Sequence, residues 1–286
     1  MVVEGTVPES DITGLVWTPD GLVLAAEQRD GPISTRLVRL TAGGAEELRT
    51  VSGEVLSLHA SGGTLLWATY DGAWRWTPGE PAPHPLPVPA DSHLLVPAGE
   101  GWLVGARRAA YLVGAQGEAT LLEASDPMFA GDLAAAGPVV AWTDQMAVWA
   151  QVGDGPPQLV ADEQRNPHGL SADGRGLVWV ESEADLLPGR PSGSFYAEHD
   201  GERWSVQRLP LSLWGEGAVL RDRVLYGSAD CVPVGAAAWV SFDLGEGGPP
   251  VAVGTEHFYW VRWDFEAQRS EIVSAPRSAC GATGSR

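Results

Sequence analysis

The sequence predicts an all-β fold, a β-propeller of seven four-stranded blades, and three observations predict it. The 286-residue chain contains 36 Gly and 22 Pro, which are spread along its whole length instead of being massed in a linker. Gly and Pro residues spread in this way are typical of many short strands joined by tight turns. A short apolar segment that often carries a late aromatic residue recurs through the chain. Helical periodicity is nearly absent, so no long amphipathic helix is expected.

The repeated unit is recognised by its second strand. The seven second-strand segments are 22–28, 64–70, 102–108, 139–145, 177–183, 223–229 and 257–263. They align on Ala25, Trp67, Val104, Trp142, Trp179, Tyr226 and Trp260. The average spacing matches the roughly 40 to 45 residues of a four-stranded propeller blade. Seven copies therefore fit the length of the chain.

We expect one propeller domain over residues 1–286. The blades are expected at 11–53, 54–89, 90–125, 126–164, 165–210, 211–250 and 251–277. Because the last copy supplies only three strands, residues 3–8 are expected to add its fourth and close the ring, which removes an exposed sheet edge. Residues 249–254 fit either the fourth strand of copy six or the first strand of copy seven. A six-bladed ring therefore remains the alternative.

The charge balance excludes two classes of partner. With 37 acidic and 18 basic residues the formal net charge is -19, which repels a nucleic-acid backbone and an anionic membrane surface. No apolar stretch approaches the 20 residues of a membrane span, so membrane insertion is not expected either. We expect a monomer whose partner is a protein, a peptide or a small polar ligand.

Two types of propeller repeat resemble parts of this chain. Segments 140–145 (VAWTDQ) and 257–263 (HFYWVRW) resemble the Tyr-Trp-Thr-Asp type of repeat. Segments 17–27 (WTPDGLVLAAE) and 170–182 (LSADGRGLVWVES) are similar to the strand-turn-strand unit of TolB-type propellers. The resemblance implies the architecture but no activity, because propellers host lyases, hydrolases, sugar binders and interaction platforms.

The Tyr-Trp-Thr-Asp pattern is incomplete in this chain. Trp142, Thr143 and Asp144 form the only near-complete copy. Arg262 stands where the pattern would have its Asp. No catalytic residue is therefore carried over from either type of repeat.

The candidate ligand-binding residues lie in loops that enter first strands or join second to third strands, where a propeller usually has its functional mouth. They are Asp91, His93, Asp126, Asn166, His168, Glu181, Glu183 and Asp185. His93 and His168 begin first strands, which would aim them at the central channel. Long loops are expected at 181–193, 228–235 and 263–269. The set could bind a small polar ligand or a divalent cation, although each residue alone also fits ordinary turn chemistry.

No motif points to a cofactor. The six His residues show no zinc-ligand spacing, and calcium has no EF-hand-like pattern to support it. A nucleophile elbow, a phosphate loop and a dinucleotide fingerprint are all missing. Trp74 and Trp76 share one strand face and could stack a sugar, but such aromatics more often pack one blade against the next.

Cys231 and Cys280 are the only cysteines, and an even pair in a chain of this kind suggests a disulfide and export. Cys231 is expected in a loop at one face and Cys280 beyond a third strand at the other. A strand separates these faces by roughly 17 to 20 Å, so the bond requires the tail to fold back. Residues 1–11 have no signal-peptide pattern. We expect an extracytoplasmic protein, periplasmic or secreted, whose leader is absent from this chain; a cytoplasmic protein is the alternative.

The function expected from these observations is non-enzymatic. The chain is expected to act as a recognition or scaffold propeller that binds a protein, peptide or sugar at the channel mouth. The alternative is a propeller enzyme, a lyase or hydrolase, with a metal in the central channel. The convergence of His93, His168, Asp91 and Glu181 on one pocket would favour the enzyme.

Overall fold

We describe the protein from a computed structural model. The structure describes residues 3–8, 11–28, 31–41, 44–88, 92–106, 109–122, 132–144, 146–164, 167–181, 193–209, 218–227, 230–236, 240–242, 248–264, 266 and 269–281. Within these ranges every regular element is a strand except one 3-10 helix, η1 (Arg277–Gly281). No helix among them is long and apolar enough to cross a membrane.

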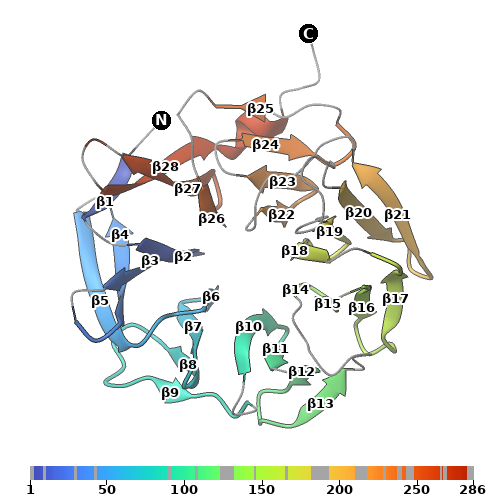
Figure 1. The fold of residues 1–286 in the computed structure, drawn as a ribbon, viewed down its shortest axis with the longest axis horizontal. Coiled ribbons are helices and arrows are strands. Elements are labelled where there is room, and N and C mark those ends of the chain that lie inside the picture. Colours follow the sequence, from blue (N-terminus) through green and yellow to red (C-terminus); the bar gives the residue numbers. More distant parts are fainter. Residues whose placement is uncertain are drawn as a thin grey trace. The chain divides into compact units, whose positions relative to one another are not determined.

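The strands form seven four-stranded sheets (Figure 1). In six sheets the strands follow one another in sequence order, and in the seventh the first strand of the chain joins the last three. These are the blades of a seven-bladed β-propeller, so the six-bladed alternative is wrong. Contacts divide the chain into two units: Met1–Leu86 with Tyr226–Pro233 and Trp239–Arg286, and Pro87–Leu225 with Val234–Ala238.

The first unit contains three whole sheets. One comprises β2 (Asp11–Thr18), β3 (Gly21–Gln28), β4 (Ser34–Thr41) and β5 (Gly44–Ser52). The next comprises β6 (Ser57–Ser61), β7 (Thr64–Thr69), β8 (Gly72–Trp76) and β9 (His84–Pro85). The last comprises β26 (Gly248–Val253), β27 (His257–Asp264), β28 (Arg269–Pro276) and β1 (Val3–Pro8).

The second unit also contains three whole sheets. The first comprises β10 (Ser92–Ala98), β11 (Gly101–Ala106), β12 (Ala109–Val113) and β13 (Ala119–Leu122). The second comprises β14 (Leu133–Ala136), β15 (Val139–Thr143), β16 (Val148–Val152) and β17 (Gln158–Ala161). The third comprises β18 (Pro167–Ala172), β19 (Gly176–Glu181), β20 (Gly193–His199) and β21 (Trp204–Leu209).

The remaining sheet comprises β22 (Val219–Arg221), β23 (Val224–Gly227), β24 (Asp230–Pro233) and β25 (Val240–Ser241). This sheet decides whether residues 249–254 belong to the sixth repeat or to the seventh. Because β25 is its fourth strand and β26 pairs with β27, residues 249–253 belong to the first strand of the last sheet.

The residues on which the seven repeats align are buried in the core. The seven aligned residues are Ala25, Trp67, Val104, Trp142, Trp179, Tyr226 and Trp260, and each is 0% to 1% exposed. The second strands are buried on both faces of their sheets: β7, for example, is buried at every position from Leu65 to Thr69, so such strands read as nearly continuous apolar runs. That burial explains why this strand carries the strongest sequence signal.

The N-terminal strand completes the last sheet, as predicted. β1 pairs antiparallel with β28 from Val3 opposite Val273 to Pro8 opposite Arg269, and the two strands lie side by side in Figure 1. The free edge of β28 is thereby paired, which removes a template for edge-to-edge aggregation.

Two of the three predicted long loops are shorter than expected. Residues 230–233 of segment 228–235 form β24. In segment 263–269, β27 runs to Asp264 and β28 begins at Arg269. The sequence did not show these strand residues, because Pro, Gly and charged residues occur within the strands as well as between them.

Cys231 and Cys280 are bonded through their sulfur atoms, and their Cα atoms lie 5.7 Å apart. Cys231 lies within β24 and not in a loop, which corrects the expectation from the sequence. The tail does fold back, because η1 follows β28 and contacts β24. Arg277 in η1 donates hydrogen bonds to the Tyr226 hydroxyl (2.9 Å) and to the Gly254 carbonyl (3.0 Å), which fixes the start of this turn.

Candidate functional site

The structure describes only some of the predicted channel-mouth residues. Asp91, Asp126, Asn166, Glu183 and Asp185 lie outside the described residues. His93 lies in β10, where only its place in the strand is described.

His168 and Glu181 lie on neighbouring strands. In the register of β18 and β19, Pro167 is opposite Glu181 and His168 is opposite Val180. The two residues therefore occupy adjacent positions where β18 begins and β19 ends. Among the described residues no group of three or more His, Cys, Asp or Glu side chains could hold a metal ion.

Several polar corner residues hold one sheet to the next. Thr35 Oγ1 accepts a hydrogen bond from the Val55 N–H (3.2 Å), which joins the first sheet to the segment that leads into the second. Asp132 accepts hydrogen bonds from the backbone N–H groups of Gly169 and Leu170. Ser171 Oγ accepts another from the Leu220 N–H (2.9 Å). Polar side chains at these corners satisfy backbone donors of the next sheet, which is a structural role.

Asp144, the acid of the near-complete Trp-Thr-Asp copy, is also structural. Its carboxylate accepts hydrogen bonds from the N–H groups of Met146 and Ala147, both at 2.7 Å, and from the Trp149 indole at 3.1 Å. The residue is 6% exposed. Burying a carboxylate is costly unless hydrogen bonds compensate, and three donors do so here.

Arg262 has a partner directly across the sheet. In the register of β27 and β28 it is opposite Glu271, whose carboxylate accepts hydrogen bonds from Arg262 and from Arg269. These hydrogen bonds, with that from Arg262 as the larger cause, lower the pKa of Glu271, which is 5% exposed. The residue that breaks the Tyr-Trp-Thr-Asp pattern therefore neutralises a buried acid.

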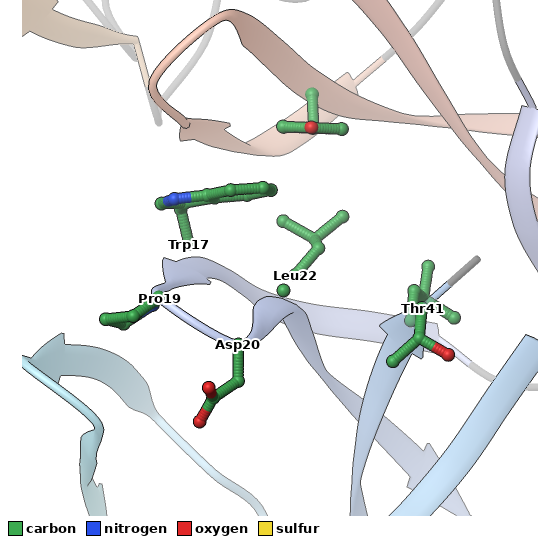
Figure 2. A pocket seen from close by; sticks show the side chains of 8 residues that line it. Trp17, Pro19, Asp20, Leu22 and Thr41 are labelled. Carbon is green, nitrogen blue, oxygen red and sulfur yellow. The ribbon is translucent and has the colours of Figure 1, made fainter. Parts of the chain in front are cut away.

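Residues at the first sheet of the chain line a hollow of about 320 Å³ (Figure 2). Trp17 and the turn of residues 19–22 form one part of it, and the end of β4 at Leu40 and Thr41 forms another. Tyr259 from β27 completes it. All of these residues belong to the first unit.

Stacked aromatic rings form one wall of the hollow. The rings of Trp17 and Tyr259 lie with centroids 5.4 Å apart and planes inclined by 10°. Tyr259 is buried in the core of this region, while Trp17 is only half-buried. A Cβ atom at position 254 would lie 3.0 Å from Trp17 Cδ2, so Gly254 leaves room for the indole ring. The stack therefore presents a partly exposed aromatic surface held in place by the scaffold.

The turn that faces Trp17 depends on a glycine. Thr18 pairs with Gly21 across the turn, and Thr18 Oγ1 donates a hydrogen bond to the Gly21 carbonyl (2.7 Å). Gly21 has φ +130°, and a Cβ atom there would lie 2.8 Å from the Leu40 carbonyl oxygen. A side chain at this position would therefore strain the backbone and press on β4. Figure 2 shows the Asp20 side chain projecting from this turn on the side away from Trp17.

The charged side chains near this turn lie on the other face of the sheet. Leu22 is opposite Leu40, whereas Arg39 is opposite Val23 and Glu46, so Arg39 and Glu46 do not share the face that lines the hollow. The Asp20 side chain is 66% exposed and lies 3.9 Å from the nearest Arg39 nitrogen, and Arg39 bonds Glu46 more closely, at 2.7 Å and 3.1 Å.

Sequence reasoning missed this site. The predicted site lay where loops enter first strands and join second to third strands, whereas the hollow lies at the opposite ends of β2 and β4. The available signal was the Trp-Thr-Pro-Asp-Gly turn, which served only as a sign of the fold. Its apposition to Tyr259 could not be read, because the two come from opposite ends of the sequence.

No family model and no curated protein matches the chain. Among solved structures it is similar to the β-propeller domain of the Trilobed protease from Pyrococcus furiosus, with TM-score 0.66, 8% identity and coverage of 93% of this chain and 97% of that one. It is similar to virginiamycin B lyase from Staphylococcus aureus, with TM-score 0.64, 12% identity and coverage of 91% and 94%.

A third similar structure is a puromycin-hydrolyzing peptidase of Mycobacterium tuberculosis, with TM-score 0.66 and 15% identity. The match covers 97% of this chain but 52% of the peptidase, so the chain spans about half the length of that protein. At these identities the likeness shows the fold alone. The chain is a β-propeller, and its site has to be argued from its own residues.

Proposed function

We propose that the protein is a non-enzymatic recognition module that binds a segment of a protein partner at the hollow beside Trp17. The observation that carries this proposal is the stack of Trp17 on Tyr259, which leaves an aromatic side chain half-buried at the edge of a hollow. The channel-mouth residues named from the sequence as the ligand-binding site stay a prediction.

The size and composition of the hollow support this proposal. A volume of about 320 Å³ is at the lower end of the range for small-molecule sites and suits one or two side chains. Trp and Tyr are enriched among the residues that dominate binding energy, because they offer a large rigid area at small conformational cost. Leu22 and Leu40 add a buried apolar base.

The test is selection of binding peptides. A random 12-residue peptide library displayed on phage would be panned on the immobilised protein, and recovered peptides would be synthesised and measured by isothermal titration calorimetry. We expect peptides whose affinity falls about tenfold or more when Trp17→Ala removes the aromatic wall, because truncating an aromatic hot spot costs about 2 kcal/mol.

Trp204→Ala is the matched control, since Trp204 is also half-buried but lies on β21 and is not among the residues that line the hollow. It should leave peptide affinity unchanged. Recovery of no binding peptide, or of peptides that bind wild-type and Trp17→Ala proteins equally, would overturn the proposal. Circular dichroism would establish that each variant is folded.

We also propose that the protein works outside the cytoplasm. The support is the disulfide between Cys231 and Cys280, since such bonds persist in oxidising compartments. Thiol titration of protein isolated from its native source, without added oxidant and with free thiols trapped at lysis, tests this. We expect no free thiol in the unfolded protein; two free thiols would contradict the proposal.

The competing proposal is a propeller enzyme, a lyase or hydrolase with a metal in the central channel. One similar structure is described as a lyase and another as a puromycin-hydrolyzing peptidase. A thermal-shift series with chelator, calcium and zinc separates the two proposals. A ligand at 100 times its Kd stabilises the fold by about 2.7 kcal/mol, so a metal-dependent shift would favour the enzyme.

A further inference from the structure

We infer that η1 is a redox-controlled latch on the sheet of β22 to β25, which we call the sixth sheet. With the bond between Cys231 and Cys280 intact, η1 holds β24 and β25 closed. When a dithiol reductant cleaves the bond, these two strands open while the rest of the propeller stays folded. The inference concerns the tail and not the hollow beside Trp17, so it does not depend on the proposed function. The residues of the latch all belong to the first unit.

The first step is the small size of the strands in the sixth sheet. β22, β23, β24 and β25 contain three, four, four and two residues, whereas β27 and β28 of the last sheet contain eight each. β25 pairs with β24 at two positions, Asp230 opposite Ser241 and Cys231 opposite Val240. Regions with few backbone hydrogen bonds open locally at a low cost in free energy. The outer part of this sheet therefore depends on support from outside it.

η1 supplies this support through a covalent bond. Cys231 in β24 is bonded to Cys280 in η1 across a sequence separation of 49, and both side chains are 0% exposed. Among the five residues of η1, all of which the structure describes, only Cys280 is buried. A single 3-10 turn has little stability of its own. Without the bond between the sulfur atoms, η1 would therefore lose its main attachment to β24.

Arg277 provides the second attachment of η1. Its guanidinium donates hydrogen bonds to the Tyr226 hydroxyl in β23 and to the carbonyl oxygens of Gly254 (3.0 Å) and Thr255 (3.3 Å). It also lies over the Tyr226 ring, 5.6 Å from the ring centroid. Arg277 thus joins the sixth sheet to the turn between β26 and β27 where η1 begins. Hydrogen bonds from a charged donor are stronger than neutral ones, so Arg277 should slow the movement of η1 away from β24.

The closed strands cover a cluster of aromatic rings. Phe242 directly follows β25 and is half-buried, and its ring centroid lies 5.6 Å from that of Phe258 and 6.5 Å from that of Trp260. The Tyr226 ring packs on Phe258 with centroids 5.1 Å apart. Phe258 and Trp260 are 0% exposed. Movement of β25 would withdraw Phe242 and give the open state an apolar surface that the closed state lacks.

The chemistry of opening is thiol–disulfide exchange with a dithiol. One thiolate of the dithiol attacks one protein sulfur, forms a mixed disulfide and displaces the other protein sulfur as a thiolate. The second thiol of the dithiol then attacks the mixed disulfide, releases the remaining protein thiolate and closes into its own disulfide. Two electrons pass to the protein, and its two thiolates take up the two protons that the dithiol gives up. An oxidising compartment keeps the latch closed.

The test is amide hydrogen exchange, followed by mass spectrometry, on the native protein with and without dithiothreitol at about pH 8. We expect exchange in peptides from β24, β25 and η1 to rise about 100-fold on reduction, an effect within the range typical of a single disulfide. Exchange in β3 and β15 should change less than about twofold. Binding of anilinonaphthalene sulfonate should rise with the opening. The double variant Cys231→Ala, Cys280→Ala should exchange like the reduced wild type without any reductant.

The role of Arg277 is tested by the rate of reduction. Because both sulfur atoms are buried, dithiothreitol reaches them only after η1 moves. Arg277→Met keeps a long apolar stem but removes the donors, so this variant should be reduced about tenfold faster than the wild type. Arg203→Met is the matched control, since the Arg203 side chain is 85% exposed and lies in the turn between β20 and β21. It should leave the rate unchanged.

Three outcomes would overturn the inference. Unchanged exchange on reduction would show that β24 and β25 stay closed without the bond. An equal rise of exchange in β3, β15 and β24 would show that the disulfide stabilises the whole fold and not one sheet. Equal rates of reduction for the wild type and Arg277→Met would show that η1 does not control access to the sulfur atoms.

Discussion

Two turns of the molecule, which we call corners, have similar sequences but differ in how far their Trp and Asp side chains are buried. Trp17 and Asp20 belong to a Trp-Thr-Pro-Asp corner, and Trp142 and Asp144 belong to a Trp-Thr-Asp corner. Trp142 is 0% exposed and Asp144 is 6% exposed, whereas Trp17 is half-buried and the Asp20 side chain is 66% exposed. Trp142 and Asp144 are therefore part of the buried core, whereas Trp17 and Asp20 remain partly or largely accessible to solvent.

The difference comes from the turn in which each corner lies. Asp144 follows the second strand β15, where the next backbone N–H groups point back at its carboxylate. Asp20 lies in the two-residue turn between first and second strands, and the residues that follow it, Gly21 and Leu22, already belong to β3, where they pair with β2. Residue type alone therefore does not assign a role; the donors that the local turn supplies decide it.

The largest expected effect separates the two tryptophans. Trp142→Ala should lower the free energy of unfolding by about 4 kcal/mol, because it leaves a cavity in a close-packed core. Trp17→Ala should lower it by about 2 kcal/mol or less, since part of the ring already faces solvent. Urea unfolding followed by far-ultraviolet circular dichroism measures both. Equal losses would contradict the distinction between a core corner and a surface corner.

The two acids should differ almost as much. Asp144→Ala should cost about 3 kcal/mol, because three donors lose a charged acceptor and one of them, the Ala147 N–H, is buried. Asp20→Ala should change the unfolding free energy by no more than about 0.5 kcal/mol, as exposed ion pairs contribute little. Asp144→Asn, which keeps one acceptor oxygen, should fall between them. A large loss for Asp20→Ala would show that its carboxylate serves the scaffold.

The sequence predicts the propeller well because the fold depends on a feature repeated in every sheet. The buried second strand, with Trp67, Trp142 or Trp260 at its centre, is an apolar run that needs no knowledge of the rest of the chain. The strand from Val3 to Pro8 was predictable for a related reason, since the last repeat lacked one strand.

The hollow was not predictable in this way. It requires Tyr259 to stack on Trp17, and no periodic pattern links residues at the two ends of the sequence. The sequence required the tail to fold back if Cys231 and Cys280 form a disulfide, but it did not show how, because the fold-back depends on η1 turning towards β24. A contact between distant residues that occurs only once in the structure produces no repeated pattern in the sequence, so it cannot be predicted from periodicity.

The threonines of the two corners provide a smaller test. Thr143 Oγ1 accepts a hydrogen bond from the Asp132 N–H (2.8 Å), whereas Thr18 Oγ1 donates to the Gly21 carbonyl (2.7 Å). Thr143→Val should cost about 1.5 kcal/mol because it removes the acceptor of a backbone donor, and Thr18→Val about 0.5 kcal/mol. Unfolding midpoints in urea measure the difference. The reverse order would contradict the assignment of the tighter network to the Trp142 corner.

A third acid, Asp230, extends the comparison to pH and should give the smallest effect. Burial raises the pKa of its carboxyl from 3.8 to about 6, so the folded protein holds a proton that the unfolded chain releases earlier. The contribution of this group to stability is therefore fully present below about pH 4 and declines as pH rises to 6, because over that interval the folded state binds more protons.

Asp230→Asn should remove that decline. The variant should melt at the same temperature as the wild type at pH 4 and at a higher temperature at pH 7. The gain in unfolding free energy at pH 7 should be less than about 1 kcal/mol, because partial exposure screens the charge. Calorimetric scans of the two proteins, with the disulfide intact, measure this directly. A wild-type and an Asp230→Asn protein whose melting temperatures differ by the same amount at both pH values would show that the Asp230 carboxyl titrates as it does in the unfolded chain, and exposure alone would then fail to rank the acids of this protein.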